Sequence, residues 1–382
     1  MRRLGTLLAF GAFGVYWGAW GVLLPDVKEQ VDASVAELGA ALLAVGLAAL
    51  PAMLLTGRLV DRVGARAMPA ALVLFGVAAL LPGLAGSVPQ LALALVLVGA
   101  TSGALDVVIN VAASGLEASG GQRVMQLAHA AFSAGFLVAA VSVGLARAAG
   151  AEPVAVLAGT AVLLFATALL NRGHAGAAPG PRADRRLRLS RRLLLLGVLC
   201  GVAFVVESGI ENWSALFLET ELDASPAVGG LGPGLFAAAM VTGRSLGHWL
   251  EAAVGDRLLL VGGAATAGGG LALAAVAPAV PVALVGFALG GAGISVAAPT
   301  LLGAAGRDAP DAERGSAVAS VTTVSYLGFL GGPPLMGVVS GALDLRAGMA
   351  MLAGIAVLLA AATASFAGDA LPLRRLQHPP RG

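Results

Sequence analysis

The stretch RGHAGAAPGPRADRRLRLSRR, at residues 172–192, decides how the rest of the chain is interpreted. It contains seven arginines, several Pro and Gly residues, and no regular apolar spacing, whereas both flanking regions consist largely of Ala, Leu, Val and Gly. Such a composition is typical of a flexible basic connector. We therefore expect an N-terminal domain at 1–171, a cytoplasmic linker at 172–192, and a C-terminal domain at 193–382.

The composition excludes an ordinary soluble protein. Of the 382 residues, 58% are hydrophobic and 12% are charged, and the mean hydropathy is +0.91. Soluble domains carry about 25% charged residues, so this chain lacks the polar residues needed to cover a water-exposed surface. An apolar run of about 20 residues crosses a bilayer. The sequence therefore predicts an all-α protein that crosses the membrane many times.

Twelve apolar runs are candidate membrane spans, six before the linker and six after it. They lie at residues 4–24, 36–56, 68–86, 89–115, 123–147, 152–171, 193–218, 227–249, 257–277, 280–303, 315–341 and 346–367. Many of their glycines occur four residues apart, as at 99/103, 286/290, 328/332 and 337/341. Small residues at this spacing allow helices to approach closely in lipid, so we expect tight helix packing.

The basic residues predict the orientation of the chain. If the termini, the linker and alternate loops share one side, that side holds all of the 23 Lys and Arg residues except Lys28, Arg147 and Arg346. Basic loops stay in the cytoplasm, which predicts a multi-pass protein of the cytoplasmic (inner) membrane with both termini cytoplasmic. The arginines border apolar spans and have no aromatic residues beside them, so we expect no nucleic-acid partner.

The sequence contains no recognisable enzyme or cofactor motif. Cys200 is the only cysteine and lies within an apolar run, which argues against disulfides and thiolate metal sites. The glycine-rich stretches at 262–270 and 286–293 lie within spans and lack the strand and the Lys-Ser/Thr ending of a phosphate-binding loop. We therefore expect no enzymatic activity, no cofactor and no resident metal.

The segment GRLVDRVGAR at residues 57–66 resembles the G-x-x-x-D-R-x-G-x-R loop of the major facilitator superfamily. This resemblance implies twelve helices in two six-helix bundles with pseudo-two-fold symmetry, a monomer, and alternating access. It assigns a conformational latch to Gly57, Asp61, Arg62, Gly64 and Arg66. The alternative is a plain cytoplasmic loop whose arginines only orient the chain. The corresponding segment of the second half, at 243–257, has Ala252 and Ala253 in place of the Asp-Arg pair.

Three further segments resemble the fucose-permease-like, sugar-permease-like branch of that superfamily. They are DVVIN at 106–110, ESGIENWSALFL at 207–218 and VSYLGFLGGPPLMG at 324–337, and Met125, His129, Ser133 and Gly135 add to the likeness. Carriers of that branch also use an acid in the first span, whereas Asp26 lies at the outer end of this one. The resemblance covers both halves of the chain.

Three acidic residues, Asp106, Glu207 and Glu211, lie well inside predicted spans. An ionised carboxylate at the centre of a bilayer costs at least about 2.5 kcal/mol, so such residues usually face a cavity and mark an ion or proton path. Two carboxylates one helical turn apart, like Glu207 and Glu211, do not both ionise readily. We therefore interpret all three as proton-coupling candidates. For Glu211 a purely structural pairing is an equal alternative.

Candidate substrate contacts come from aromatic and amide side chains. Flat rings beside amides and carboxylates suit a small polar ring such as a sugar; for the aromatic residues, Trp20 included, the alternative is an interfacial belt. Gln126, His129 and Ser133 form one polar stripe, although a buried histidine is more often a packing residue. The complete set of candidates is Tyr16, Trp17, Asn110, Gln126, His129, Ser133, Asn212 and Trp213.

These observations together predict a secondary active transporter that moves a small polar solute, such as a sugar, by proton-coupled symport across the lipid bilayer. One alternative is proton-coupled efflux of amphipathic, drug-like compounds. Exporters of the superfamily usually carry a Gly-Pro motif in the fifth span, and residues 123–147 contain no proline. The other alternative is a membrane receptor or scaffold that does not transport.

Overall fold

The computed structural model describes residues 2–120, 124–172, 190–309 and 314–365, and within these ranges every regular element is a helix. The chain divides into two compact units. Unit 1 contains residues 1–182 and 212–234, and unit 2 contains residues 183–211 and 235–382. The helices α7 (Arg191–Glu221) and α9 (Leu231–Val254) therefore contribute residues to both units. The expected linker falls almost entirely on residues 173–189, outside the described residues.

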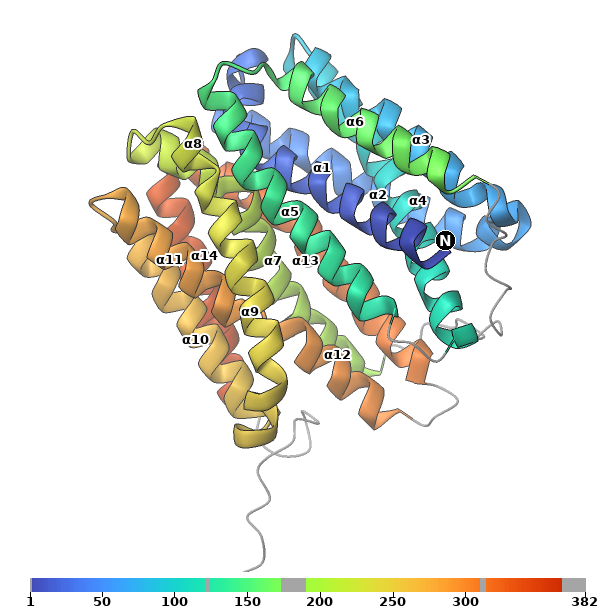
Figure 1. The fold of residues 1–382 in the computed structure, drawn as a ribbon. Coiled ribbons are helices and arrows are strands. Elements are labelled where there is room, and N and C mark those ends of the chain that lie inside the picture. Colours follow the sequence, from blue (N-terminus) through green and yellow to red (C-terminus); the bar gives the residue numbers. More distant parts are fainter. Residues whose placement is uncertain (1, 121–123, 173–189, 310–313, 366–382) are drawn as a thin grey trace, which may run out of the picture. The chain divides into compact units, whose positions relative to one another are not determined.

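Unit 1 is built on three pairs of packed helices (Figure 1): α1 with α5, α2 with α4, and α3 with α6. Their bounds are α1 Arg2–Gln30, α2 Val35–Val63, η1 Gly64–Arg66, α3 Ala67–Leu80, η2 Leu81–Leu84, α4 Val88–Gly120, α5 Val124–Ala148 and α6 Pro153–Leu170. The end of α7, the short α8 (Pro226–Gly229) and the start of α9 complete the unit, and α8 packs on α5.

Unit 2 repeats this pairing. Its further helices are α10 Asp256–Ala275, α11 Val280–Ile294, α12 Ala297–Asp308, α13 Arg314–Ala342 and α14 Leu345–Ser365. The helices α10 and α14 pack together as α3 and α6 do, while Gly328 of α13 meets Gly201 of α7 and Gly291 of α11 meets Phe236 of α9. The same order of pairs in both halves of the sequence is the internal repeat of a twelve-helix fold.

Glycines hold several of these pairs together, as their spacing predicts. A Cβ atom on Gly99 of α4 would collide with the backbone of Val45 on α2, and one on Gly286 of α11 would meet the backbone of α10. Close backbone approach replaces the hydrophobic drive that lipid does not supply between helices. The expectation of tight glycine-mediated packing is therefore confirmed for the pairs 99/103, 286/290 and 328/332.

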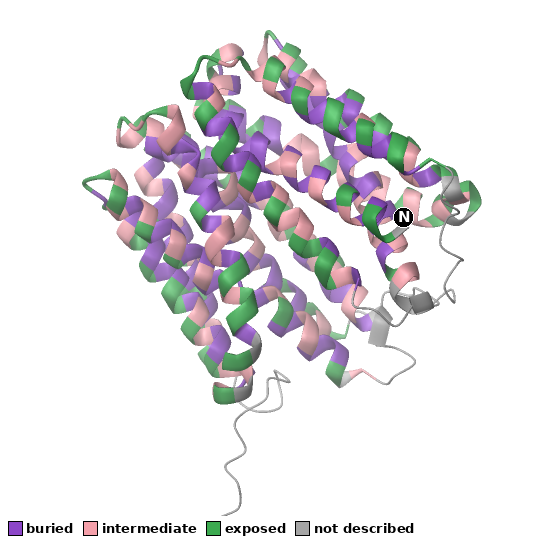
Figure 2. Ribbon diagram, in the orientation of Figure 1, coloured by how far each residue is buried: buried purple, intermediate pink, exposed green. Residues whose placement is uncertain are grey.

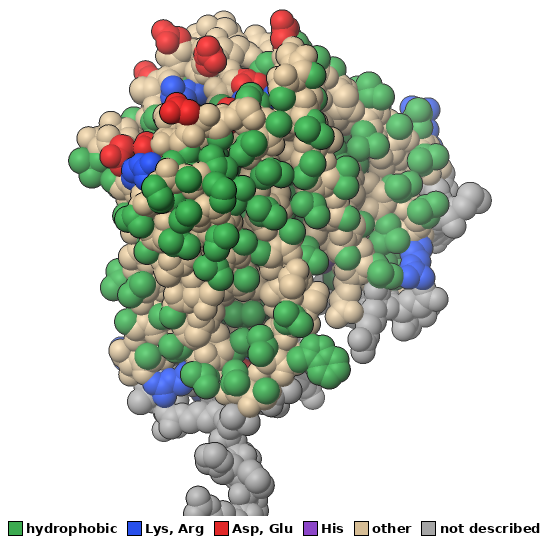
Figure 3. Space-filling view, turned by 60° about the vertical axis from the view of Figure 1, so that its left-hand side comes forward, with side chains coloured by type: hydrophobic (Ala, Val, Ile, Leu, Met, Phe, Trp, Pro, Cys, Tyr) green, Lys and Arg blue, Asp and Glu red, His purple; other side chains and the backbone are tan. Residues whose placement is uncertain are grey.

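The outer faces of the helices are apolar. Figure 2 shows exposed residues along helices whose other side is buried, and Figure 3 shows hydrophobic side chains spread over the middle of one face. Among the exposed hydrophobic residues of unit 2 are Leu258, Val285, Val357 and Leu358, each more than half exposed. A patch of this kind is unfavourable in water and is covered by lipid. Eleven segments of the described chain are long and apolar enough to cross a membrane, and the 29-residue α13 is a further long helix.

Two expectations about helix ends need correction. The segment predicted as a loop at 57–66 is helical up to Val63, because the apolar face of α2 continues past Gly57, and only Gly64, with φ +60°, makes the turn. The span predicted at 280–303 is interrupted: α11 ends at Ile294 and α12 begins at Ala297. Conversely, α13 continues through Pro333 and Pro334.

Candidate functional site

Asp106 and Asn110 lie together on α4, as their spacing predicts. The Asn110 side-chain amide donates to the Asp106 backbone carbonyl at 2.9 Å and to the Asp106 carboxylate at 3.1 Å. Both residues are half-buried, within the candidate span Val88–Leu116. Because the amide occupies one carboxylate oxygen, the carboxylate has one oriented partner among the described residues, and its other oxygen can exchange a proton or bind a donor.

Glu207 and Glu211 lie one turn apart on α7, and Glu207 has a basic partner. Arg244 of α9 donates from Nη2 to Glu207 Oε1 at 3.2 Å. The Glu207 side chain is 13% exposed and the Arg244 side chain 44%. Glu211 is within electrostatic reach of both. Three charged groups thus meet within apolar helices of unit 2, and the sequence pattern had indicated only the two acids.

The aromatic candidates of unit 1 form a cluster around α1. The Tyr16 ring meets Phe75 edge-on with centroids 4.7 Å apart and Trp17 at 5.3 Å. Tyr16 is fully buried, whereas Trp17 is half-buried. Trp20 and Trp213 are 1% and 0% exposed, so the alternative of an interfacial belt is wrong for both. Asn212, next to Trp213 on α7, is half-buried.

The polar stripe of α5 is only partly assembled into a site. Ser133 donates to the backbone carbonyl of His129 at 3.1 Å, and the His129 ring packs edge-on against Phe10 of α1, with centroids 5.3 Å apart. Gln126 and His129 are exposed and Ser133 is half-buried. The three residues share one face of α5.

Among the residues of the expected latch, Gly57, Asp61 and Arg62 lie in the last two turns of α2, and Gly64 and Arg66 in η1. The Arg62 side chain is exposed. In the second half the eroded segment has a pairing of its own: the buried Asp256 binds Arg307, which also contacts Glu251 at 3.6 Å. The latch role of residues 57–66 stays a prediction.

The most highly bonded charge cluster of the described chain had not been recognised from the sequence. Arg147 of α5 binds Asp26 of α1 with Nε at 2.7 Å and with Nη2, and binds Glu219 of α7 at 2.6 and 2.9 Å. The arginine side chain is 1% exposed. A signal was present, because Arg147 is one of three basic residues on a side whose loops are otherwise acidic.

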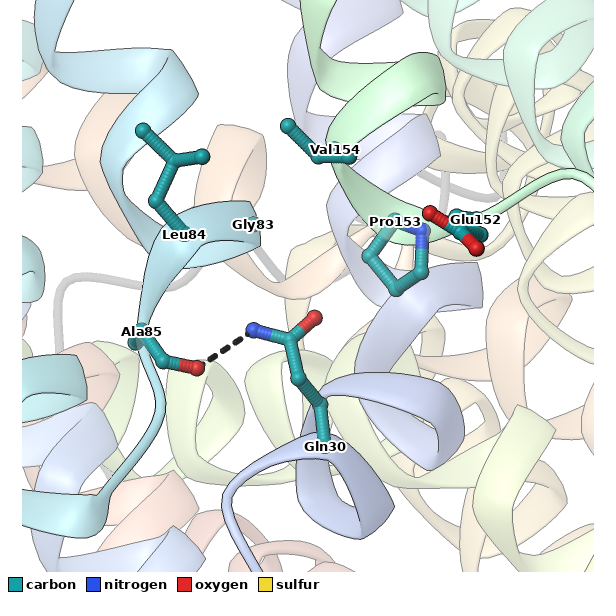
Figure 4. Close-up of a pocket in the computed structure, with 7 residues that line it drawn as sticks. All are labelled: Gln30, Gly83, Leu84, Ala85, Glu152, Pro153 and Val154. Atoms are coloured by element: carbon teal, nitrogen blue, oxygen red, sulfur yellow. Dashed lines mark hydrogen bonds between the residues drawn. The ribbon is translucent and has the colours of Figure 1, made fainter.

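A hollow of about 500 Å³ lies between the end of α1, η2 and the start of α6 (Figure 4). Gln30 points into it and donates to the carbonyls of Ala85 and Pro82 at 2.6 and 3.2 Å. None of the candidate residues lines this hollow. Across the described ranges, His, Cys, Asp and Glu nowhere form a group of three that could hold a metal ion.

Comparison with known proteins extends over nearly the whole chain. The family model of the Major Facilitator Superfamily matches residues 5–251 and 202–381. An uncharacterized MFS-type transporter of Yersinia pestis is 32% identical over 345 residues, which cover 89% of each chain. The membrane protein MosC of Rhizobium meliloti is 30% identical and covers 94% of this chain and 89% of its own.

Solved structures with the same fold are more distant in sequence. A bacterial homologue of the human lysosomal transporter Spinster has a TM-score of 0.79 at 15% identity and covers 94% of this chain and 95% of its own. The D-xylose-proton symporter has a TM-score of 0.77 at 16% identity, and the match covers 97% of this chain and 98% of the symporter.

The paired helices, the apolar outer faces and the buried charges define a polytopic membrane protein of the all-α transporter class. The chain belongs to the major facilitator superfamily. The likeness to the fucose-permease-like branch stays a prediction.

Proposed function

We propose that this protein is a secondary active transporter that moves a small polar solute together with protons across the cytoplasmic membrane. The observation that carries the proposal is the placement of Asp106, Glu207 and Glu211 within apolar helices. Charged groups at such depth are unfavourable unless they face a path for ions or polar solutes. In this proposal both termini and residues 172–192 are cytoplasmic, as the distribution of basic residues favours.

Asp106 is the first candidate for carrying the proton. Its carboxylate accepts one hydrogen bond from Asn110 and is half-buried. When protonated, the group is neutral and its apolar surroundings cost little; when ionised, it keeps the Asn110 amide as partner. A carboxylate with one fixed partner therefore binds and releases protons as its surroundings alternate between the two sides.

We assign the binding of the solute to Trp17, Tyr16 and Asn110 in unit 1. The α5 stripe of Gln126, His129 and Ser133, in the same unit, has the same proposed role. Trp17 is the half-buried ring of the aromatic cluster and therefore the one that can stack on a solute. Neighbours with this fold include a D-xylose-proton symporter and a nucleoside transporter, both named for small polar solutes. This supports a small, polar substrate.

The test is uptake into proteoliposomes with an imposed pH gradient, first by a solute screen with the wild-type protein. Asp106→Asn should abolish gradient-driven accumulation and leave exchange of solute without a gradient. Glu152→Gln is the matched control, because Glu152 is exposed at the start of α6 and its side chain forms no capping hydrogen bond there. Unchanged accumulation in Asp106→Asn contradicts the proton role. Accumulation inside only when the gradient is reversed favours the efflux alternative.

A further inference from the structure

Arg244 forms fewer hydrogen bonds than Arg147 or Arg346. It lies in the last turn of the candidate span Pro226–Gly247, and α9 continues beyond this span to Val254. A guanidinium has five N–H donors, yet in the described part of the chain Arg244 forms a single hydrogen bond, to Glu207 at 3.2 Å. Its side chain is 44% exposed. Most of its donors are therefore available to something other than the protein.

The surroundings indicate what the free donors face. A guanidinium exposed to hydrocarbon is strongly unfavourable, so its exposed part faces water or a solute. Arginines with structural roles here have more of their donors filled: Arg346 donates to the carbonyls of Ala275 and Ala277, at the end of α10. Arg244 has no such carbonyl partner among the described residues, and its one partner is itself a carboxylate.

We infer that Arg244 recognises the carboxylate of the transported solute, and that Glu207 forms an ion pair with Arg244 when the solute is absent. This inference rests on the proposed function and names its substrate class, a small monocarboxylate such as a sugar acid. Glu207 already shows that a carboxylate fits this guanidinium. A planar guanidinium binds a carboxylate through two parallel hydrogen bonds, so a free carboxylate can make a contact that the single 3.2 Å bond does not make.

The charges around Glu207 define how proton and solute are exchanged. On α7 itself lie Glu211 and the Cys200 thiol, and α9 supplies Arg244. The described parts of the other helices packed on α7 add Tyr326, whose ring meets Phe204, and uncharged groups. These are Gly332 on Ser208, Leu352 on Gly209 and Gly290 on Ile210.

These groups suggest how Glu207 and the solute carboxylate exchange places at Arg244. A proton binds a Glu207 carboxylate oxygen, which breaks the ion pair and leaves Arg244 to the carboxylate of the solute. On release, the solute departs, Glu207 loses its proton and the ion pair with Arg244 forms again. The charge of the proton bound by Glu207 and the charge of the monoanion cancel, so the exchange at Arg244 itself adds no net charge to the transport step.

The experiment measures thermal unfolding of the purified full-length protein with a panel of millimolar monocarboxylates, among them D-gluconate, each paired with its neutral alcohol or amide. We expect at least one acid to stabilise the wild-type protein and its neutral counterpart to have no effect. Arg244→Gln should weaken the binding of that acid about ten- to a hundred-fold, because charge-assisted hydrogen bonds are lost. Ser245→Ala, on the same helix, is the control and should bind as the wild type does.

Glu207→Gln is the second variant, and it covers the case in which Arg244→Gln does not fold. Without the competing carboxylate, the acid should bind more tightly and with little dependence on pH. Stabilisation by neutral solutes alone, or by no member of the panel, overturns the inference. The proposed function is judged separately, by accumulation in Asp106→Asn proteoliposomes, and survives if only neutral solutes act.

Discussion

Arg147 and Arg244 both bind carboxylates within apolar helices, but they do so in opposite ways. Arg147 is 1% exposed and forms four hydrogen bonds to Asp26 and Glu219, on two other helices. Arg244 is 44% exposed and forms one, to Glu207. A guanidinium whose donors are filled on both sides is part of the framework, whereas one with free donors can change partner. The number of filled donors therefore separates a structural ion pair from an exchangeable one.

The Arg147 cluster also has a topological role within unit 1. It connects the end of α7, which follows residues 172–192, to α1 and α5, which precede them. Close to it, Gly230 packs on Gly144 and on the carbonyl of Ala140 in α5. A buried ion cluster with four hydrogen bonds next to a close backbone contact fixes this end of unit 1.

The largest expected effect follows from removing Arg147. Arg147→Met leaves the Asp26 and Glu219 carboxylates without their partner and should lower the free energy of unfolding by about 3–5 kcal/mol. Thermal or denaturant unfolding in detergent measures this. The matched control is Lys28→Ala, since Lys28 lies near Asp26 in sequence on the same helix end; its effect should stay within about 0.5 kcal/mol.

A charge-free variant separates the loss of a partner from the loss of packing. Combining Asp26→Asn and Glu219→Gln with Arg147→Met removes the orphaned charges and should recover much of the stability. If the single variant unfolds like the wild type, or if the triple variant is no more stable than the single one, the cluster does not have this framework role.

A smaller effect is expected at Gly230. Gly230→Ala would place its Cβ 2.6 Å from the Ala140 carbonyl oxygen, so α8 must move away from α5. Overpacking of this kind costs about 1–3 kcal/mol. Gly159→Ala on α6 is the matched control, because nothing lies within 4 Å of its Cβ position, and the added helix propensity should stabilise by up to about 1 kcal/mol. Equal unfolding midpoints for the two variants would contradict the close contact.

Local patterns predicted much of this molecule. Apolar runs located most of the helices, although α1 and α2 continue past their predicted ends to Gln30 and Val63, and glycine pairs indicated that α4 and α13 approach other helices closely. The spacing of four residues correctly predicted that the Asn110 side chain lies against Asp106. All of these depend on residues within one helix, where periodicity carries the information.

The partners of Arg147 and Arg244 could not be predicted in the same way. Asp26 and Glu219 are 121 and 72 residues from Arg147, and Glu207 is 37 residues from Arg244. No helical period connects such positions, and only the packing of α1, α5, α7 and α9 brings them together. The end of α2 was missed for a different reason: a glycine and two arginines suggested a loop, but the helix continues until Gly64 adopts a positive φ.

The smallest expected effect on stability is also the most informative one. Arg244→Gln should lower the free energy of unfolding by at most about 1 kcal/mol, because the pair with Glu207 is partly exposed and makes one contact.

Double-mutant cycles measure the strength of each ion pair directly, with Arg244→Gln and Glu207→Gln in one cycle and Arg147→Met and Glu219→Gln in the other. We expect the coupling energy of the Arg147 pair to exceed that of the Arg244 pair several-fold, since a buried, doubly bonded guanidinium interacts in a lower dielectric environment. Equal coupling energies would mean that Arg244 is as firmly held as Arg147, and its free donors could then not be those of a group that changes partner during transport.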